Sequence, residues 1–411
     1  MTLSGLNLDS FDLEPGFLFG GPLDAVTPPS PDPSLDHHWM LEAFRTSMSG
    51  IGISNPNPAV GCVIVDSKGT EISRGFTHRF GDIHAERDAL LQVQDINRLQ
   101  DATLYVTLEP CSHQGNQPPC VDLILSSPIR RVVISQTDPN PTVNGTGIQK
   151  LIVAGKEVHV GIYAQETTAW NFPFFIQQIL KRPCIALKWA QTLDGQLADD
   201  SQTSQWITGP TARAYTHWLR QRYDAILVGA RTLLTDLPQL TARDCREPRQ
   251  HSPLPIIFDP KGICFGPDFG PDTGTLLSHR KAVVVTAEST LLKHSSSWVC
   301  TQKNILILTI PGKHLGKELK NVMTRPELSS FLGRPFQSVL VEGGPQTLSL
   351  FLQENAADIL HVFVAPLLTG GQKNRISQKP PQNLLHAAHR YHLAATSQLG
   401  QDCVMELIQK L

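Results

Sequence analysis

Three side chains that commonly bind metal ions lie between positions 84 and 120. His84 is followed two residues later by Glu86, and two cysteines come further along, Cys111 in Glu-Pro-Cys and Cys120 in Pro-Pro-Cys. One imidazole and two thiolates are the donors of a catalytic zinc site that keeps its fourth position open for water. Such a site brings the pKa of bound water to roughly 7, which suits hydrolysis. Glu86 is not needed as a ligand and is free to move protons.

The order of these residues is typical of zinc enzymes that remove an amino group from a nucleobase. Those enzymes bind zinc through His, Cys and Cys, and a non-ligand Glu in H-x-E acts as acid and base. Glu86 fits both proton steps, because it can take a proton from water and deliver it to the ring nitrogen and the departing amine. The Cys111–Cys120 spacing is wider than P-C-x-x-C, so it alone leaves the substrate class open. The alternative is a structural zinc site closed by a fourth ligand, for which His113 is the candidate.

The surrounding segments predict an α/β layer fold that places these side chains at the ends of strands and helices. Asp82 is the expected N-cap of a helix that reaches about Val93, so His84 and Glu86 should lie in its first turn. Two prolines before Cys120 favour a helix start there, and a helix N-terminus stabilises a thiolate. Further strands are predicted at 59–65, 71–75, 103–107, 131–135 and 158–161, and further helices at 37–49 and 147–154.

A second α/β unit is predicted to begin near Lys181. No G-x-G-x-x-G follows a strand in it, so the common dinucleotide fingerprint is absent from the sequence. Gly343-Gly344, between a strand and a helix, is a candidate phosphate cradle, although a plain turn is the alternative. We expect strands at 184–190, 225–229, 254–259, 282–286, 304–310, 338–341, 360–365 and 403–407, helices at 211–222, 327–333 and 346–353, and surface loops at 243–253, 266–279 and 371–390.

Composition excludes some classes of protein. The 411 residues carry a net charge of −2, so no broad nucleic-acid or membrane footprint is expected. No apolar run is long enough to cross a bilayer, and the N-terminus does not resemble a secretory signal. Eight irregularly spaced cysteines indicate reduced thiols, so a cytoplasmic protein is expected. The expected organisation is a disordered arm at 1–35, a first domain at 36–180 and a second at 181–411.

Many stretches of the chain, in the same order, resemble the bifunctional deaminase–reductase family of riboflavin biosynthesis. The resemblance covers about residues 36 to 411 and leaves only the N-terminal arm unmatched. In the first half it is carried by Asn57–Cys62, His84–Glu86, Thr107–His113, Pro118–Cys120 and Asp138–Pro141, and in the second by Leu187-Lys188, Thr192–Gly195, Ser204–Thr208, Asp236, Pro238, Leu240-Thr241, Val341–Pro345 and Ala365-Pro366.

This resemblance implies a three-layer cytidine-deaminase-like domain followed by a dihydrofolate-reductase-like domain, with zinc and NADPH as cofactors. It implies two successive reactions on a small phosphorylated pyrimidine. A diaminopyrimidinone with a ribosylamino 5-phosphate loses its 2-amino group, and NADPH then reduces the ribosyl chain to ribityl. His84, Cys111 and Cys120 would hold zinc, and Glu86 would be the proton donor. A homo-oligomer is left open.

The resemblance also implies binding residues. Reduction needs an acid to open the sugar ring and a hydride donor held close, and Asp236 and Glu342 are the candidate polar groups. Arg220 and Arg243 are candidate phosphate clamps, with exposed, solvated arginines as the alternative. Trp206 would lie against the cofactor, or in the core. The cofactor set is Ala190, Trp206, Thr232, Asp236, Gly343 and Gly344; the substrate set is Asn57, Ser204, Arg220, Leu240, Arg243 and Glu342, with Lys188 as a further candidate unless it snorkels from an edge strand.

Three positions depart from the family pattern. Thr77 stands where His is usual, with His78 one place later; Asn116 replaces Lys or Arg; and Pro260 replaces a Ser near the cofactor. Loss of a cation weakens phosphate binding, so Arg79 is a candidate replacement. One alternative is therefore a reductase with a weak or idle deaminase domain. A zinc deaminase acting on RNA or free nucleosides would leave the second half unexplained, and a zinc-dependent binding protein would turn over neither substrate.

Overall fold

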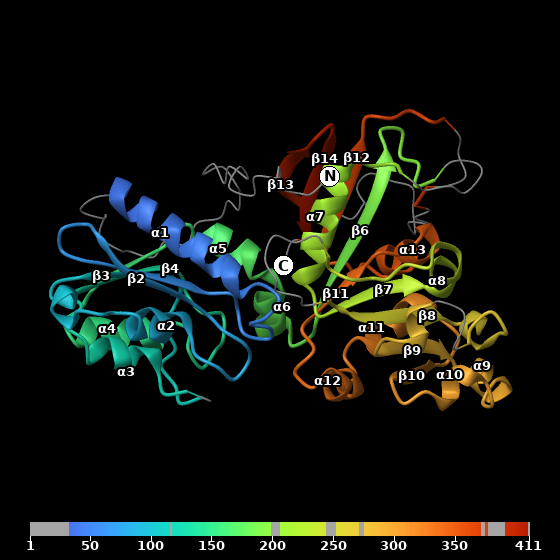
Figure 1. Cartoon of the computed structure of the whole chain (residues 1–411), viewed down its shortest axis with the longest axis horizontal. Coiled ribbons are helices and arrows are strands. Elements are labelled where there is room, and N and C mark those ends of the chain that lie inside the picture. The colour runs from blue at the N-terminus through green and yellow to red at the C-terminus, as the bar shows by residue number, and fades with distance from the viewer. Residues whose placement is uncertain are drawn as a thin grey trace. The chain divides into compact units, whose positions relative to one another are not determined.

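The computed structural model describes residues 33–115, 117–198, 206–243, 252–270, 275–370, 375–376 and 391–409. The chain divides into two compact units, here called the N-terminal and C-terminal units, which part between Lys181 and Arg182 (Figure 1). Most of the arm predicted at residues 1–35 lies outside the described residues, but Pro33 already begins a helix. Among the described helices, none combines the length and apolarity that a membrane crossing requires.

The N-terminal unit is built on a five-stranded sheet with the order β2-β1-β3-β4-β5. Strand β1 is antiparallel to β2 and β3, whereas β3, β4 and β5 are parallel. Every strand predicted in this half is confirmed, with ends that differ by a few residues. The strands are β1 (Gly61–Val65), β2 (Glu71–Phe76), β3 (Thr103–Leu108), β4 (Arg131–Gln136) and β5 (Glu157–Val160).

Helices cover both faces of this sheet (Figure 1). Alternate residues of β1 face opposite ways: Cys62 and Ile64 pack with α2 and α3, whereas Val63 and Val65 pack with α1. The predicted three-layer domain is thereby confirmed. One face carries α1 (Pro33–Ser47) and α5 (Ala164–Trp170), and the other carries α2 (Ala85–Leu91), α3 (Cys120–Leu125) and α4 (Thr146–Val153); α6 (Phe172–Leu180) ends the unit, and η2 (Met48–Gly50) and η3 (Ile96–Leu99) are short 3₁₀ turns.

The C-terminal unit is built on a nine-stranded sheet with the order β10-β9-β8-β7-β11-β6-β12-β14-β13. The first seven strands in this order, from β10 through β12, are parallel to one another, so their carboxyl ends point to the same side of the sheet. The last strand expected from the sequence, at 403–407, corresponds to β14, but β13, which was not predicted, pairs with β14 and forms the edge of the sheet. The strands are β6 (Cys184–Thr192), β7 (Ala225–Gly229), β8 (Leu254–Asp259), β9 (Ala282–Ala287), β10 (Ile305–Ile310), β11 (Ser338–Val341), β12 (Ile359–Ala365), β13 (Tyr391–Leu399) and β14 (Asp402–Gln409).

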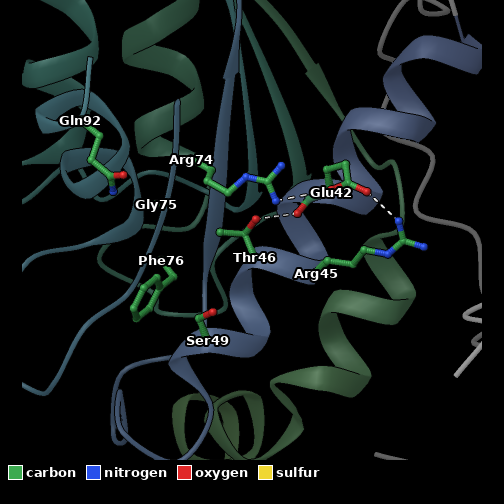
Figure 2. A pocket seen from close by; sticks show the side chains of 8 residues that line it. All are labelled: Glu42, Arg45, Thr46, Ser49, Arg74, Gly75, Phe76 and Gln92. Carbon is green, nitrogen blue, oxygen red and sulfur yellow. Dashed lines mark hydrogen bonds and ion pairs between the residues drawn. The ribbon is translucent and has the colours of Figure 1, made fainter. Parts of the chain in front are cut away.

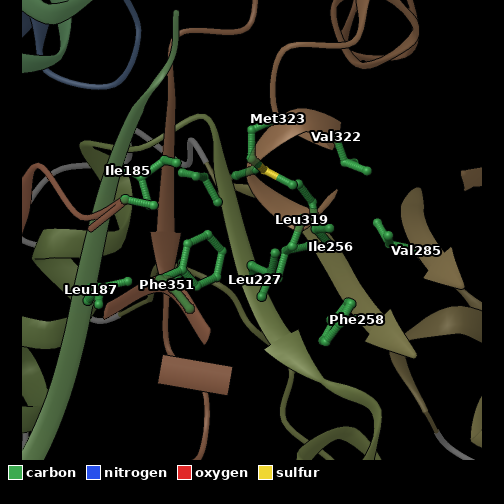
Figure 3. Packing of buried hydrophobic residues seen from close by; sticks show 14 of the residues in the cluster. Ile185, Leu187, Leu227, Ile256, Phe258, Val285, Leu319, Val322, Met323 and Phe351 are labelled. Atoms are coloured by element: carbon green, nitrogen blue, oxygen red, sulfur yellow. The ribbon is translucent and has the colours of Figure 1, made fainter. Parts of the chain in front are cut away.

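The main core of this unit lies between the sheet and three helices. Figure 3 shows Ile185, Leu187 and Leu227 of the sheet facing Leu319 and Phe351 of the helices. The opposite face is covered by α7 and α8. The helices are α7 (Pro210–Gln221), α8 (Ala230–Asp236), α9 (Glu288–Lys293), α10 (Trp298–Thr301), α11 (Leu315–Val322), α12 (Pro326–Leu332) and α13 (Pro345–Gln353), with 3₁₀ turns η4 (Ile263–Phe265) and η5 (Leu276–Ser278).

One predicted surface loop is wrong. Within 266–279, Phe269, Leu276 and Leu277 are 4%, 2% and 0% exposed and join the core beneath β7 and β8. Gly, Pro and Asp between these residues hide any apolar period, so the sequence pattern indicated a loop.

Candidate functional site

The three predicted zinc ligands meet at the ends of three elements. His84 precedes α2, Cys111 lies in the loop after β3, and Cys120 is the first residue of α3. Their ligand atoms all lie within 4.8 Å of one another. The predicted N-cap is wrong, because His84 occupies the cap position of α2 and the Asp82 carboxylate accepts from the N–H of Ile83 instead.

The separations within this group fit a zinc ion. His84 Nδ1 lies 3.6 Å from the Sγ atoms of both Cys111 and Cys120. A tetrahedral zinc ion with its usual bond lengths separates a nitrogen from a sulfur ligand by about 3.6 Å. Among the described residues, no fourth His, Cys, Asp or Glu joins the group, and His113 is exposed. The structural-site alternative therefore lacks its fourth ligand.

Glu86 is buried beside these ligands. Burial and the nearby Cys111 raise the pKa of its carboxyl group to about 7, and His84 opposes this shift. A cation held by the cluster would lower that pKa again. The pKa of the Cys111 thiol is lowered by hydrogen bonds from Cys120 and His84, and the Cys120 backbone N–H donates to Cys111 Sγ at 3.3 Å. The cluster thus already favours a thiolate at Cys111.

A buried carboxylate holds the loop that carries Cys111. Glu109 accepts hydrogen bonds from the backbone N–H groups of Gly145 and Gly147, both at 2.9 Å. The N–H groups of Asp138 and Ile148 also point to it, at 3.2 and 3.3 Å. A Cβ on Gly147 would lie 2.4 Å from the Pro110 carbonyl oxygen, so only glycine permits this approach. This role of Glu109 was not predicted, although the residue belongs to a motif of the sequence. The usable signal was a carboxylate placed between a buried strand and the first cysteine.

Thr77, which departs from the family pattern, and its neighbours His78 and Arg79 have different surroundings. Thr77 is 3% exposed and its N–H donates to the Val60 carbonyl oxygen. His78 stacks on Phe76 and its Nε2 lies 3.0 Å from the carboxylate of Asp88. Arg79 is exposed. Of the remaining residues predicted for this half, Asn57 is half-buried in the turn before β1, and Asn116 lies outside the described residues.

A surface cavity of about 360 Å³ in the same unit contains none of the predicted site residues. Figure 2 shows its lining, with Arg45 and Arg74 directed toward Glu42. The Arg45–Glu42 and Arg74–Glu42 separations are 2.6 and 3.5 Å, and Arg74 also pairs with Glu71 at 2.5 Å. Because these charges compensate one another, the cavity offers no unmatched charge to a ligand.

In the C-terminal unit, charged side chains gather where β11 ends beside the middle of β6. Glu342 directly follows β11 and accepts two hydrogen bonds from Arg220 of α7, at 2.8 and 2.9 Å. Burial alone would raise the Glu342 pKa, but Arg220 and Lys188 lower it to about 2. Lys188 lies on β6, between β11 and β12, so the edge-strand alternative for it is wrong. Its Nζ lies 5.0 Å from the ring centre of Phe363.

Thr241 lies between Arg220 and a second predicted arginine, Arg243. The Thr241 oxygen accepts from Arg220 NH1 and from His217 Nδ1, both at 3.1 Å. Arg243 is exposed, with NH1 3.5 Å from Thr241 Oγ1, and Leu240 is buried in the core at 2% exposure. His217 was not predicted as a site residue, although its place three residues before Arg220 on one helix was a usable signal.

Two of the predicted cofactor residues lie directly after β11, next to Glu342. Gly343 and Gly344 join β11 to α13, and Gly344 is the N-cap residue of that helix. A Cβ on Gly343 would lie 2.6 Å from Thr347 Cβ, whereas nothing lies within 4 Å of one on Gly344. The turn thus leaves a bare helix N-terminus, which fits a phosphate of NADPH.

The other predicted residues of this unit are spread over several elements. Trp206 is 66% exposed and stacks on the Arg213 guanidinium at 4.5 Å, so the core alternative for it is wrong. Ala190 is half-buried on β6, and Ser204 lies outside the described residues. Thr232 is half-buried and Asp236 exposed on α8; Pro260 follows β8, where its carbonyl oxygen accepts from Thr290 Oγ1 at 3.1 Å.

Two family models match the chain, one in each half. Residues 33–136 match the cytidine and deoxycytidylate deaminase zinc-binding region, and residues 183–405 match the RibD C-terminal domain. The riboflavin biosynthesis protein RibD of Aquifex aeolicus is 38% identical over 82% of this chain and 88% of its own length. RibD of Escherichia coli is 32% identical over 91% and 99%.

Solved structures give the same result. The diaminohydroxyphosphoribosylaminopyrimidine deaminase/5-amino-6-(5-phosphoribosylamino)uracil reductase of Thermotoga maritima is 31% identical, covers 92% of this chain and 99% of its own, and superposes with a TM-score of 0.75. One form of Acinetobacter baumannii RibD has the same identity and coverage, with a TM-score of 0.74.

Proposed function

Because the chain belongs to the RibD family of riboflavin-biosynthesis proteins, we propose a role for each of the two groups of polar residues described above. The chain is a bifunctional enzyme, with a zinc-dependent deaminase in its first half and an NADPH-dependent reductase in its second. The proposed first substrate is a diaminopyrimidinone with a ribosylamino 5-phosphate. The proposed second substrate is the deaminated product, 5-amino-6-(5-phosphoribosylamino)uracil.

For deamination, His84, Cys111 and Cys120 are the proposed zinc ligands, and the observation that supports them is the pair of 3.6 Å separations between nitrogen and sulfur. Zinc bound there supplies a Lewis acid that lowers the pKa of water to about 7. Glu86 takes up a proton at its carboxylate while water adds to the ring carbon that bears the amino group. It then gives a proton to the departing amine, so that water and the substrate yield a carbonyl group and ammonia. Asn57 is the proposed contact to the pyrimidine.

For reduction, the turn at Gly343-Gly344 and the N-terminus of α13 are proposed to hold a phosphate of NADPH, which supplies the hydride. Arg220 and Arg243 are proposed to bind the substrate phosphate. The Arg220 guanidinium has five N–H donors, so it can keep its bonds to Glu342 and Thr241 and still donate to a ligand. With its pKa lowered to about 2, Glu342 is an acceptor for substrate hydroxyls and a poor acid for opening the ring.

Separate assays of the two reactions test this assignment. Ammonia release is measured with the 2-amino substrate, and NADPH oxidation with the deaminated product, both with the purified full chain. Glu86→Gln should abolish ammonia release and leave NADPH oxidation unchanged, because Glu86 lies in the other unit. Glu71→Gln on β2 is the matched control and should change neither rate. Ammonia release that persists in Glu86→Gln would overturn the role of Glu86.

One observation favours the alternative of a reductase with a weak deaminase. Thr77 is buried and neutral, and His78 is paired with Asp88, so neither offers a free cation to the phosphate of the first substrate. In that case the wild-type chain would oxidise NADPH normally but release ammonia slowly, with a raised KM. A normal KM for the 2-amino substrate excludes this alternative.

A further inference from the structure

The segment 237–241, here called the turn after α8, has an unfavourable backbone conformation in the reductase unit. Leu237 and Leu240 have φ angles of 42° and 51°, in the left-handed region that residues other than glycine avoid. Such conformations persist only where the surrounding structure holds them, and they gather at functional sites. The buried side chain of Leu240 anchors the turn to the core from below.

The far end of this turn is held by α7. The Thr241 carbonyl oxygen receives both the Nδ1–H of His217 and NH1 of Arg220, at 3.1 Å each. The two side chains lie three residues apart on α7 and therefore on one face of the helix. Because Arg220 is fixed in turn by Glu342, the turn is joined through Thr241 to the charged group at the end of β11.

The hydrogen bond to Thr241 also fixes the imidazole of His217. A carbonyl oxygen only accepts, so Nδ1 must have the hydrogen, and NH1 of Arg220, 3.4 Å from Nδ1, therefore donates to Thr241 instead. Burial and the nearby Arg220 and Arg243 lower the pKa of His217 to about 4. At neutral pH the imidazole thus adds a hydrogen bond to this region and no charge.

We propose that His217 is a positioning residue for the substrate phosphate of the reductase. Its hydrogen bond holds the Thr241 carbonyl, and with it the strained turn, so that Arg243 stays beside Arg220. The inference rests on the proposed function, in which both arginines bind that phosphate. It assigns His217 no contact with the substrate.

Two substitutions separate positioning from direct contact. An Asn side chain can present an amide N–H near the place of His217 Nδ1, whereas the longer Gln side chain reaches toward the place of Nε2. If His217 acts by holding Thr241, His217→Asn should preserve phosphate binding and His217→Gln should not. If Nε2 contacted the phosphate, the order would be reversed.

The test compares steady-state reduction of 5-amino-6-(5-phosphoribosylamino)uracil with that of its dephosphorylated form. His217→Ala should raise KM for the phosphorylated substrate roughly tenfold, a factor worth about 1.4 kcal/mol and near the upper range for one neutral hydrogen bond. The kcat should stay within about twofold, the dephosphorylated substrate should be unaffected, and His217→Asn should restore KM. His392→Ala, an exposed histidine on β13, is the matched control, and melting curves report on folding.

Equal losses for both substrates, an unchanged KM in His217→Ala, or rescue by Gln but not Asn would overturn the proposal. Calorimetric titration with inorganic phosphate gives a readout that needs no turnover. His217→Ala should weaken phosphate binding by a similar factor, and unchanged affinity would refute the positioning role. A wild-type chain that binds phosphate but oxidises no NADPH would refute the proposed function instead.

Discussion

The carboxylate of Glu109 accepts a hydrogen bond from the backbone N–H of Gly147, at 2.9 Å. This bond fastens the residue before Pro110-Cys111 to the first turn of α4. The same helix also binds Ser112, the residue after Cys111. Thr146 Oγ1 lies 2.5 Å from Ser112 Oγ, and Lys150 Nζ donates to the Ser112 carbonyl oxygen at 2.8 Å. The proposed zinc ligand Cys111 is thus held between two anchors on one helix.

Replacement of Glu109 should weaken zinc binding. Outer partners that orient metal ligands are commonly worth roughly 10- to 100-fold in metal affinity. Glu109→Ala leaves buried N–H groups without an acceptor and should lower zinc affinity by at least about tenfold. Glu109→Gln should have an intermediate effect, because the amide keeps one acceptor oxygen. Competition with a chromophoric chelator measures the affinity, and Glu71→Ala on β2 is the control. Undiminished zinc affinity in folded Glu109→Ala would contradict this reading.

Removal of zinc should separate the two activities. A chelator should stop ammonia release and leave NADPH oxidation of the deaminated substrate intact, because the reductase residues belong to the other unit. Cys111, which is half-buried and has a lowered thiol pKa, should become open to alkylation at the same time, since the metal no longer occupies its thiolate. Adding zinc back before alkylation should restore ammonia release. Parallel loss of both activities on chelation would argue against two independent sites.

Arg79 should provide charge for the phosphate of the deaminase substrate. It is exposed in the loop that leads to His84, whereas Thr77 is buried and His78 is paired with Asp88. A hydrogen bond to a charged group contributes about 1.5–3 kcal/mol, so Arg79→Ala should raise KM for ammonia release by roughly 10- to 100-fold. NADPH oxidation should not change. Arg98→Ala, which removes a guanidinium bonded to Asp66 at 2.7 Å, is the control. An unchanged KM would show that other groups bind this phosphate.

Local patterns predicted much of the fold. Continuous apolar runs such as 225–228 and 282–286 became buried stretches of parallel strands, because both faces of their sheet are covered. Prolines before Cys120 and at the start of α7 marked helix starts. The zinc group was predictable because its three ligands lie within 37 residues, counted from His84 to Cys120, at the ends of elements that the sequence also indicates.

Contacts between distant segments could not be predicted in this way. Asp36 and Arg131 form a buried pair at 2.6 Å across 95 residues, and Arg220 and Glu342 pair across 122. Nothing in either local sequence selects such a partner, since that choice depends on how the sheet brings helices together. Strand β13 was missed because polar and apolar residues do not alternate along this partly exposed edge strand, and that alternation is what marks a half-buried strand in a sequence.

Acid should destabilise the reductase unit through Glu342. Folding lowers the pKa of this carboxyl group from 4.5 to about 2, chiefly because the ion pair with Arg220 outweighs burial. The ionised form therefore stabilises the folded unit above about pH 4.5, and this contribution is lost as the pH falls from 4.5 toward 2. The pKa difference corresponds to a stabilisation on the order of 3 kcal/mol.

Glu342→Gln removes this titration, so the stability difference between the variant and the wild type should be large at pH 7 and shrink below about pH 4.5. Glu406, whose pKa is also lowered to about 2, is present in both proteins and cancels from the difference. Hydrogen exchange of peptides from α7 and β11 reports the opening free energy of this region directly, and Glu354→Gln, an exposed carboxyl in the same unit, is the control. A difference that stays constant from pH 7 to pH 3 would mean that Glu342 does not titrate with the Arg220 pair, and the assignment of its charge would have to be abandoned.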